Sequence, residues 1–128
     1  MQKLGAVLFL LVTLSVCGGS GASKVEMVDA QRFEPQELTV ASGDTISFKN
    51  VSSEAHTVTA YADEIPADAD YFTSGGLASE EAAQEELSAG LVAAGDTYEL
   101  TLEQPGTYRY FCIPHEEAGM KGTVVVEG

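Results

Sequence analysis

Apolar residues recur two positions apart in short segments from Val25 to the C-terminus, and turn-forming residues separate these segments. A spacing of two is the period of a β-strand that buries one face. Gly, Pro and Asp in segments 41–44 and 103–106 favour turns between strands. The pattern predicts an all-β domain, namely an antiparallel-rich, two-sheet Greek-key β-sandwich of about seven or eight strands. The pairs that carry the pattern are Leu38 and Val40, Ile46 and Phe48, Tyr98 with Leu100 and Leu102, and Val124 and Val126.

Residues 61–94 interrupt this rhythm with eight acidic residues and no Lys or Arg. Within them, residues 79–90 predict a helix, because Ser79 can cap the N-terminus and Gly90 can end it. We expect a short acidic helical insert in a connection between two strands. An acidic docking face for a partner is the alternative interpretation.

The N-terminus is typical of an export signal. Lys3 precedes a 13-residue apolar run, residues 4–16, which is shorter than the roughly 20 residues that span a bilayer. We therefore expect residues 1–17 to direct export to the periplasm or to the extracytoplasmic face of the cytoplasmic membrane.

Two ways of processing this signal remain open. Leu14-Ser15-Val16-Cys17 resembles a lipobox, in which Cys17 would be lipidated and would anchor the protein to the membrane. Cleavage near Ala22 would instead release a soluble protein. In either case, residues 18–23 form a Gly/Ser tether and residues 24–128 form one domain.

The charge of the chain is strongly acidic. All 20 Asp and Glu follow residue 17, with only five Lys and Arg beside them. Such a surface repels nucleic acid, which excludes that class of partner. The even spread of acids favours adaptation to high salt, where charges are screened within a few ångströms. Steering toward a basic protein partner is a compatible alternative.

Three soft ligands lie within nine positions near the C-terminus, namely Cys112, His115 and Met120. His56 is the only other histidine of the chain. Two neutral imidazoles, a thiolate and a thioether form the set that selects copper, in a trigonal His2Cys site with a long axial bond to sulfur. Zinc prefers four strong ligands and is served less well.

Each of these residues also has an ordinary structural explanation. A histidine can be a surface residue, a methionine can fill a gap in the core, and Cys112 can be a small buried hydrophobe. Their joint occurrence favours a metal site. Metal binding would also protect Cys112, which is left as a lone thiol if Cys17 is removed or lipidated.

The segments 105–128, 33–50 and 55–60 resemble plastocyanin and the halocyanins, which are small blue copper proteins or cupredoxins. The resemblance implies a cupredoxin-like fold that binds one type 1 copper ion through His56, Cys112, His115 and Met120. It also implies that His115 reaches the surface within an apolar patch and serves as the electron-transfer port.

This chain departs from the resembled pattern at two positions. Thr57 stands where many members have an asparagine that ties the two ligand loops together. Phe111 stands where plastocyanin usually has a tyrosine beside a second port, and its lack of a hydroxyl argues against use of that port.

The resemblance implies a one-electron carrier between a protein donor and a protein acceptor, with membrane complexes as the expected partners. We expect a monomer. We also expect no enzymatic activity, because four protein ligands on the copper leave no coordination position open for a substrate. A copper delivery or storage protein is the alternative. An oxidase or nitrite-reductase domain would need further histidines for a second copper.

Overall fold

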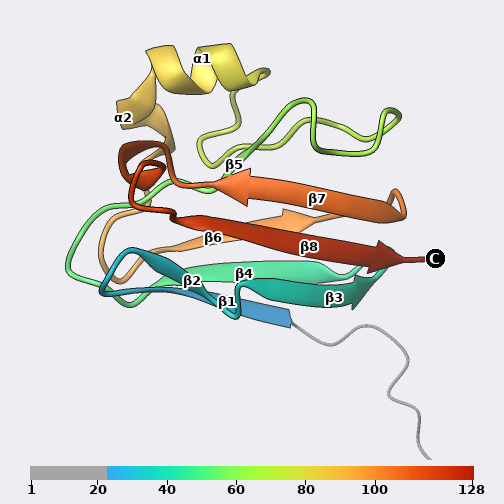
Figure 1. The fold of residues 1–128 in the computed structure, drawn as a ribbon, viewed down its shortest axis with the longest axis horizontal. Helices are drawn as coiled ribbons and strands as arrows, with labels where there is room; N and C mark the ends of the chain where they lie inside the picture. The colour runs from blue at the N-terminus through green and yellow to red at the C-terminus, as the bar shows by residue number, and fades with distance from the viewer. Residues whose placement is uncertain (1–22) are drawn as a thin grey trace, which may run out of the picture.

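Eight strands form two four-stranded sheets that face one another in the computed structural model, which describes residues 23–128 (Figure 1). The strands of the first sheet are, in spatial order, β2 (Arg32–Glu34), β1 (Ser23–Val28), β4 (Thr45–Asn50) and β6 (Thr97–Thr101). Those of the second are β3 (Glu37–Ala41), β8 (Lys121–Glu127), β7 (Gly106–Phe111) and β5 (Thr59–Ala60).

Each sheet contains one parallel pair, β1 with β4 and β3 with β8, while the remaining pairs are antiparallel. The predicted sandwich of seven or eight strands is therefore confirmed, with both sheets mixed.

The N-terminal predictions fall largely outside the described residues. These are the export signal at 1–17, the lipidation of Cys17 and the tether from residue 18 onward. Ser23, expected as the last tether residue, is the first residue of β1. None of the helices within residues 23–128 is long and apolar enough to cross a membrane.

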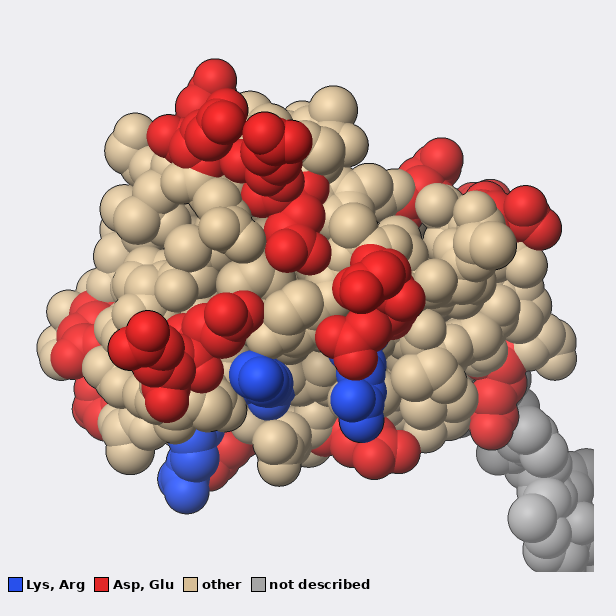
Figure 2. Space-filling model, turned by 45° about the horizontal axis from the view of Figure 1, so that its top comes forward, with Lys and Arg blue, Asp and Glu red and all other residues tan. Residues whose placement is uncertain are grey.

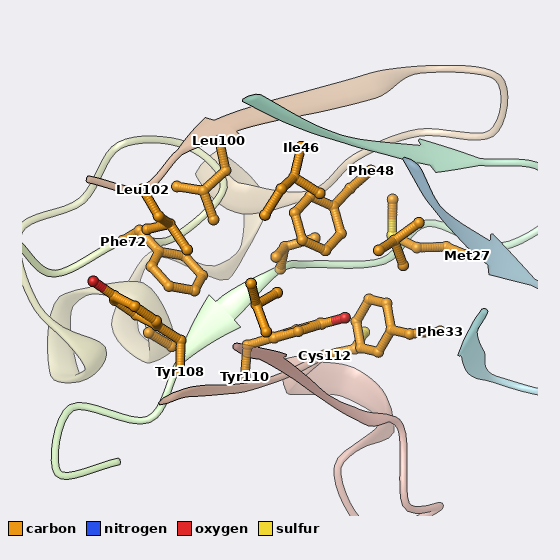
Figure 3. Packing of buried hydrophobic residues seen from close by; sticks show 14 of the residues in the cluster. Met27, Phe33, Ile46, Phe48, Phe72, Leu100, Leu102, Tyr108, Tyr110 and Cys112 are labelled. Atoms are coloured by element: carbon orange, nitrogen blue, oxygen red, sulfur yellow. The ribbon is translucent and has the colours of Figure 1, made fainter. Parts of the chain in front are cut away.

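The core between the sheets contains most of the alternating residues that predicted the strands, among them Ile46, Phe48 and Val124. Tyr110 of β7 lies at its centre, with the ring of Phe33 at 4.7 Å and that of Phe48 at 5.4 Å between centroids, both edge-on (Figure 3). Edge-on contacts of this kind stabilise aromatic pairs beyond the burial of their area. Cys112 belongs to the same buried cluster, so the core reaches the end of β7 without a break.

The acidic insert contains helical residues as predicted, but they form two short helices and not the single helix predicted for residues 79–90. Ser79 caps the first helix as expected, accepting a hydrogen bond from the Ala82 N–H at 3.1 Å. The chain then breaks at Glu86, where φ is −113° and ψ is 50°. The resulting helices are α1 (Glu80–Glu85) and α2 (Leu87–Gly90).

Tertiary contact explains the break. Gly90 packs so closely on the backbone of Ser74 that a Cβ there would lie 2.7 Å from the Ser74 carbonyl oxygen. The Ser74 hydroxyl also donates to the Gly90 carbonyl at 2.7 Å. Docking α2 on this loop requires a change of direction that one straight helix would not make. Both helices lie outside β5, which is an edge strand (Figure 1).

Acidic side chains are spread over the face shown in Figure 2, with a few Lys and Arg between them. The ion pairs of Lys and Arg within residues 23–128, such as Arg109 with Glu64 at 3.4 Å, join exposed groups. Exposed pairs contribute little to stability, so the packed core holds the fold together.

Two buried tyrosines give a matched test of this packing. The Tyr108 hydroxyl donates to the Gln104 carbonyl at 2.6 Å, whereas the buried Tyr110 hydroxyl has no partner within residues 23–128. We expect Tyr108→Phe to lower the free energy of unfolding by about 1 kcal/mol, because it removes a hydrogen bond. Tyr110→Phe should leave it unchanged or raise it, because it removes an unpaired polar atom from the core. Urea unfolding would measure both, and the reverse order would contradict this account.

Candidate metal centre

His56 is held at one end of the sandwich by backbone pairing. Its N–H donates to the Val92 carbonyl at 3.2 Å, and its own carbonyl accepts from the Val92 N–H at 2.7 Å. His56 lies between β4 and β5, whereas Val92 follows α2. The pairing therefore joins two segments that are distant in the sequence. His56 is only 1% exposed, so its imidazole points into the protein.

The other three candidates lie on the loop from β7 to β8. Cys112 directly follows β7, and His115 ends the short 3-10 helix η1 (Ile113–His115). Two backbone hydrogen bonds close the loop, from the Cys112 N–H to the Met120 carbonyl at 3.0 Å and from the Met120 N–H to the His115 carbonyl at 3.2 Å. Gly119, with φ of 85°, makes the left-handed bend before Met120.

The fold brings three of the predicted donor atoms to one point. The Nδ1 atoms of His56 and His115 are 3.1 Å apart, and the Cys112 Sγ lies 3.7 Å from the first and 3.4 Å from the second. Within residues 23–128, these three residues have potential metal-ligand atoms that all lie within 4.8 Å of one another. Met120 is fully buried at the base of the same loop.

This donor set fits copper. A thiol sulfur and two imidazole nitrogens that converge in a buried space are the His2Cys donor set of type 1 copper sites, and Met120, buried on the same loop, would supply a thioether sulfur. The residues present thus satisfy the chemistry that the sequence predicted.

Burial shapes the titration of two of these groups. It raises the pKa of the Cys112 thiol, an effect that the N–H of Thr57 partly opposes. It also lowers the pKa of His56, and the neighbouring His115 lowers it further. The imidazole of His56 is therefore kept neutral, as ligation requires, while the thiol needs a nearby cation to become a thiolate.

Both imidazoles have a hydrogen-bonding partner on the side away from the sulfur. The Ser52 Oγ lies 2.8 Å from the His56 Nε2, and the Glu54 Oε2 lies 3.1 Å from the His115 Nε2. With Nε2–H as donor, each ring presents its Nδ1 to the centre. Sequence reasoning missed these two residues, although the polar segment 50–55 directly before His56 was a visible signal.

Thr57 provides the link between the two ligand loops. Its hydroxyl accepts from the Ile113 N–H at 2.9 Å, and its own N–H donates to the Cys112 Sγ at 3.3 Å. The tie that the resemblance assigns to an asparagine is therefore made here by a threonine.

Phe111 is buried behind another aromatic ring. Tyr61 stacks on it with centroids 4.2 Å apart and an interplanar angle of 18°. The Tyr61 hydroxyl donates to the Glu116 Oε2 at 2.9 Å. Whether a second port operates here stays a prediction.

Comparison with known proteins agrees with this geometry. The family described as copper binding proteins, plastocyanin/azurin family, matches residues 21–127. Plastocyanin A/B of Petroselinum crispum is 43% identical over 94 residues, which are 73% of this chain and 86% of that protein. The chloroplastic plastocyanin minor isoform of Arabidopsis thaliana is 43% identical over 95 residues, and the match spans half of its length.

A solved structure gives the same result for the fold. The oxidized and reduced structures of a mutant plastocyanin of a fern match with a TM-score of 0.58 and 28% identity, over 82% of this chain and all of that one. The sandwich, the clustered donor atoms and these likenesses lead to one conclusion. The chain belongs to the plastocyanin/azurin family of copper-binding proteins.

Proposed function

We propose that this protein is an exported one-electron carrier that holds one type 1 copper ion through His56, Cys112, His115 and Met120. The observation that carries the proposal is the convergence of two Nδ1 atoms and one thiol Sγ at separations of 3.1 to 3.7 Å. Copper bound there would supply a Cu(II)/Cu(I) couple, and soft sulfur ligands would favour Cu(I). The relatives support this role, since they are plastocyanins and the fern protein is described in oxidized and reduced forms.

The surrounding residues are arranged to keep the ligands in place during electron transfer. Thr57, next to His56 in the chain, accepts a hydrogen bond from the loop that carries Cys112. Backbone hydrogen bonds close this loop between Cys112 and Met120. A site that moves little between two oxidation states needs little reorganisation at each transfer. The sandwich thus supplies the rigid support that a carrier requires.

His115 is the proposed port for electrons. Its side chain is 15% exposed, whereas His56 is 1% exposed and Cys112 fully buried. Two exposed apolar residues, Val51 and Leu91, lie near this end. Val51 follows Asn50 and Leu91 precedes Val92, and a hydrogen bond from the Asn50 side chain to the Val92 carbonyl joins the two segments beside His56. This end of the molecule therefore offers apolar surface to a partner.

The cellular setting is part of the proposal. Residues 1–17 direct export, and residues 24–128 form the carrier domain in the periplasm or at the extracytoplasmic face of the membrane. Cys17 either carries a lipid anchor or is removed by cleavage near Ala22. The donor and acceptor are protein redox partners, with membrane complexes as the proposed class, and the carrier is a monomer without enzymatic activity.

Copper delivery or storage is the second candidate. Exchange of metal favours exposed, labile ligands, but Cys112, His56 and Met120 are at most 1% exposed. Transfer of copper to a mild chelator within minutes would support delivery, whereas retention for many hours supports the carrier.

Spectroscopy of the copper-loaded protein tests the proposed ligands. We expect Cu(II) bound to residues 24–128 to give an intense blue thiolate-to-copper band and a narrow copper hyperfine splitting in electron spin resonance. Cys112→Ser should abolish both signals, because it removes the thiolate. A pale wild-type protein with ordinary copper splitting would contradict the carrier.

The tie at Thr57 can be tested with a near-isosteric pair. Thr57→Val removes the acceptor for the Ile113 N–H and should lower the free energy of unfolding by about 1 to 3 kcal/mol. It should also slow electron self-exchange, because the two ligand loops are no longer joined. Thr57→Ser keeps a hydroxyl and serves as the control. Equal stability and exchange rates in all three proteins would show that the tie is not needed.

A further inference from the structure

The two imidazoles of the metal centre differ in the charge of their outer partners. The Nε2 of His56 lies 2.8 Å from a neutral group, the Ser52 hydroxyl. The Nε2 of His115 lies 3.1 Å from an anionic group, the Glu54 carboxylate. Both partners come from the segment between β4 and His56. The centre thus has one uncharged side and one negatively charged side, and the negative side is the one nearest the solvent.

Glu54 is held in this position although its side chain is 53% exposed. Its backbone carbonyl accepts from the Asn50 Nδ2 at 2.7 Å and from the Ser52 hydroxyl at 3.0 Å. Its carboxylate accepts a second hydrogen bond from the Gln31 Nε2 at 3.3 Å. The first two contacts fix the backbone of Glu54, and the contact from Gln31 orients its Oε2 atom beside the His115 ring.

We propose that Glu54 is a positioning residue that lowers the reduction potential of the bound copper and fixes the His115 ring. The inference rests on the proposed function, since it requires His115 to be a copper ligand. By accepting the Nε2–H, the carboxylate makes His115 a stronger donor and keeps its Nδ1 directed to the Cys112 Sγ. It would also place a negative charge on the far side of the His115 ring from a bound metal.

The sign of the effect follows from the charges of the two states. Reduction adds one electron from a donor protein and lowers the charge of the metal from two to one. A fixed negative charge stabilises the more positive state, Cu(II), more strongly than Cu(I). Glu54 therefore opposes reduction. It counteracts the sulfur ligands, which favour Cu(I).

The test compares two single-charge changes near the same loop. Glu54→Gln keeps the size of the side chain but removes its charge. Glu117→Gln is the matched control, because Glu117 is exposed, lies two residues from His115 and makes no ion pair with the described residues. The reduction potential of each copper-loaded variant would be measured by redox titration of the blue band at about 0.1 M and about 1 M salt, since salt screens distant charges more than contacting ones.

We expect Glu54→Gln to raise the potential by about 59 mV, which is a tenfold change in the ratio of Cu(II) to Cu(I) affinities for a one-electron couple. Most of this shift should persist at high salt, and Glu117→Gln should give a much smaller shift that high salt removes. In the Cu(I) protein, the nuclear magnetic resonance signal of the His115 Nε2–H should exchange faster with water in Glu54→Ala than in the wild type.

The outcomes separate this inference from the proposed function. A blue wild-type protein whose potential changes equally in Glu54→Gln and Glu117→Gln would overturn the role of Glu54 and leave the carrier intact. A wild-type protein without the blue band would overturn both.

Discussion

A buried thiol packed against two imidazoles is the arrangement on which the rest of the metal centre depends. Cys112 is enclosed by the aromatic core, which raises the pKa of its thiol, so a thiolate there needs a cation within bonding distance. The same core gives the sulfur a fixed position, because Tyr110 near the end of β7 and Cys112 directly after it are both buried in it. The packing that stabilises the domain therefore also holds a ligand of the metal centre.

The segment from Asn50 to His56 organises the other side of the centre. Asn50, with its amide between the Glu54 and Val92 carbonyls, fixes the segment against the connection that follows α2. Ser52 and Glu54 then contact the two imidazoles at their Nε2 atoms. One short loop consequently orients both histidines, although they are 59 residues apart in the sequence. A change within this loop would be felt at both ligands.

The proposed copper ligands differ in their exposure to solvent in a way that suits an electron carrier. Three of the proposed ligands are enclosed, and only His115 has part of its ring accessible, beside a carboxylate. Acidic side chains are spread over the face shown in Figure 2, and none of the Asp and Glu residues within 23–128 is buried. The proposed port for electrons, His115, therefore lies at one end of the sandwich.

The sequence by itself determined the sandwich, the four candidate ligands and the choice of copper. Alternation in segments such as 124–126 reports which face of a strand is buried, and the spacing of Cys112, His115 and Met120 is local to one loop. The tertiary structure decided what depends on contacts between distant segments. These are the break at Glu86 beside the docking of Gly90 on Ser74, the hydrogen bond from Ile113 to the Thr57 hydroxyl, and the contact of the Glu54 carboxylate with His115. Such contacts depend on which loops lie next to one another in the folded protein. The hydrophobic period of one segment does not report which other segment it contacts.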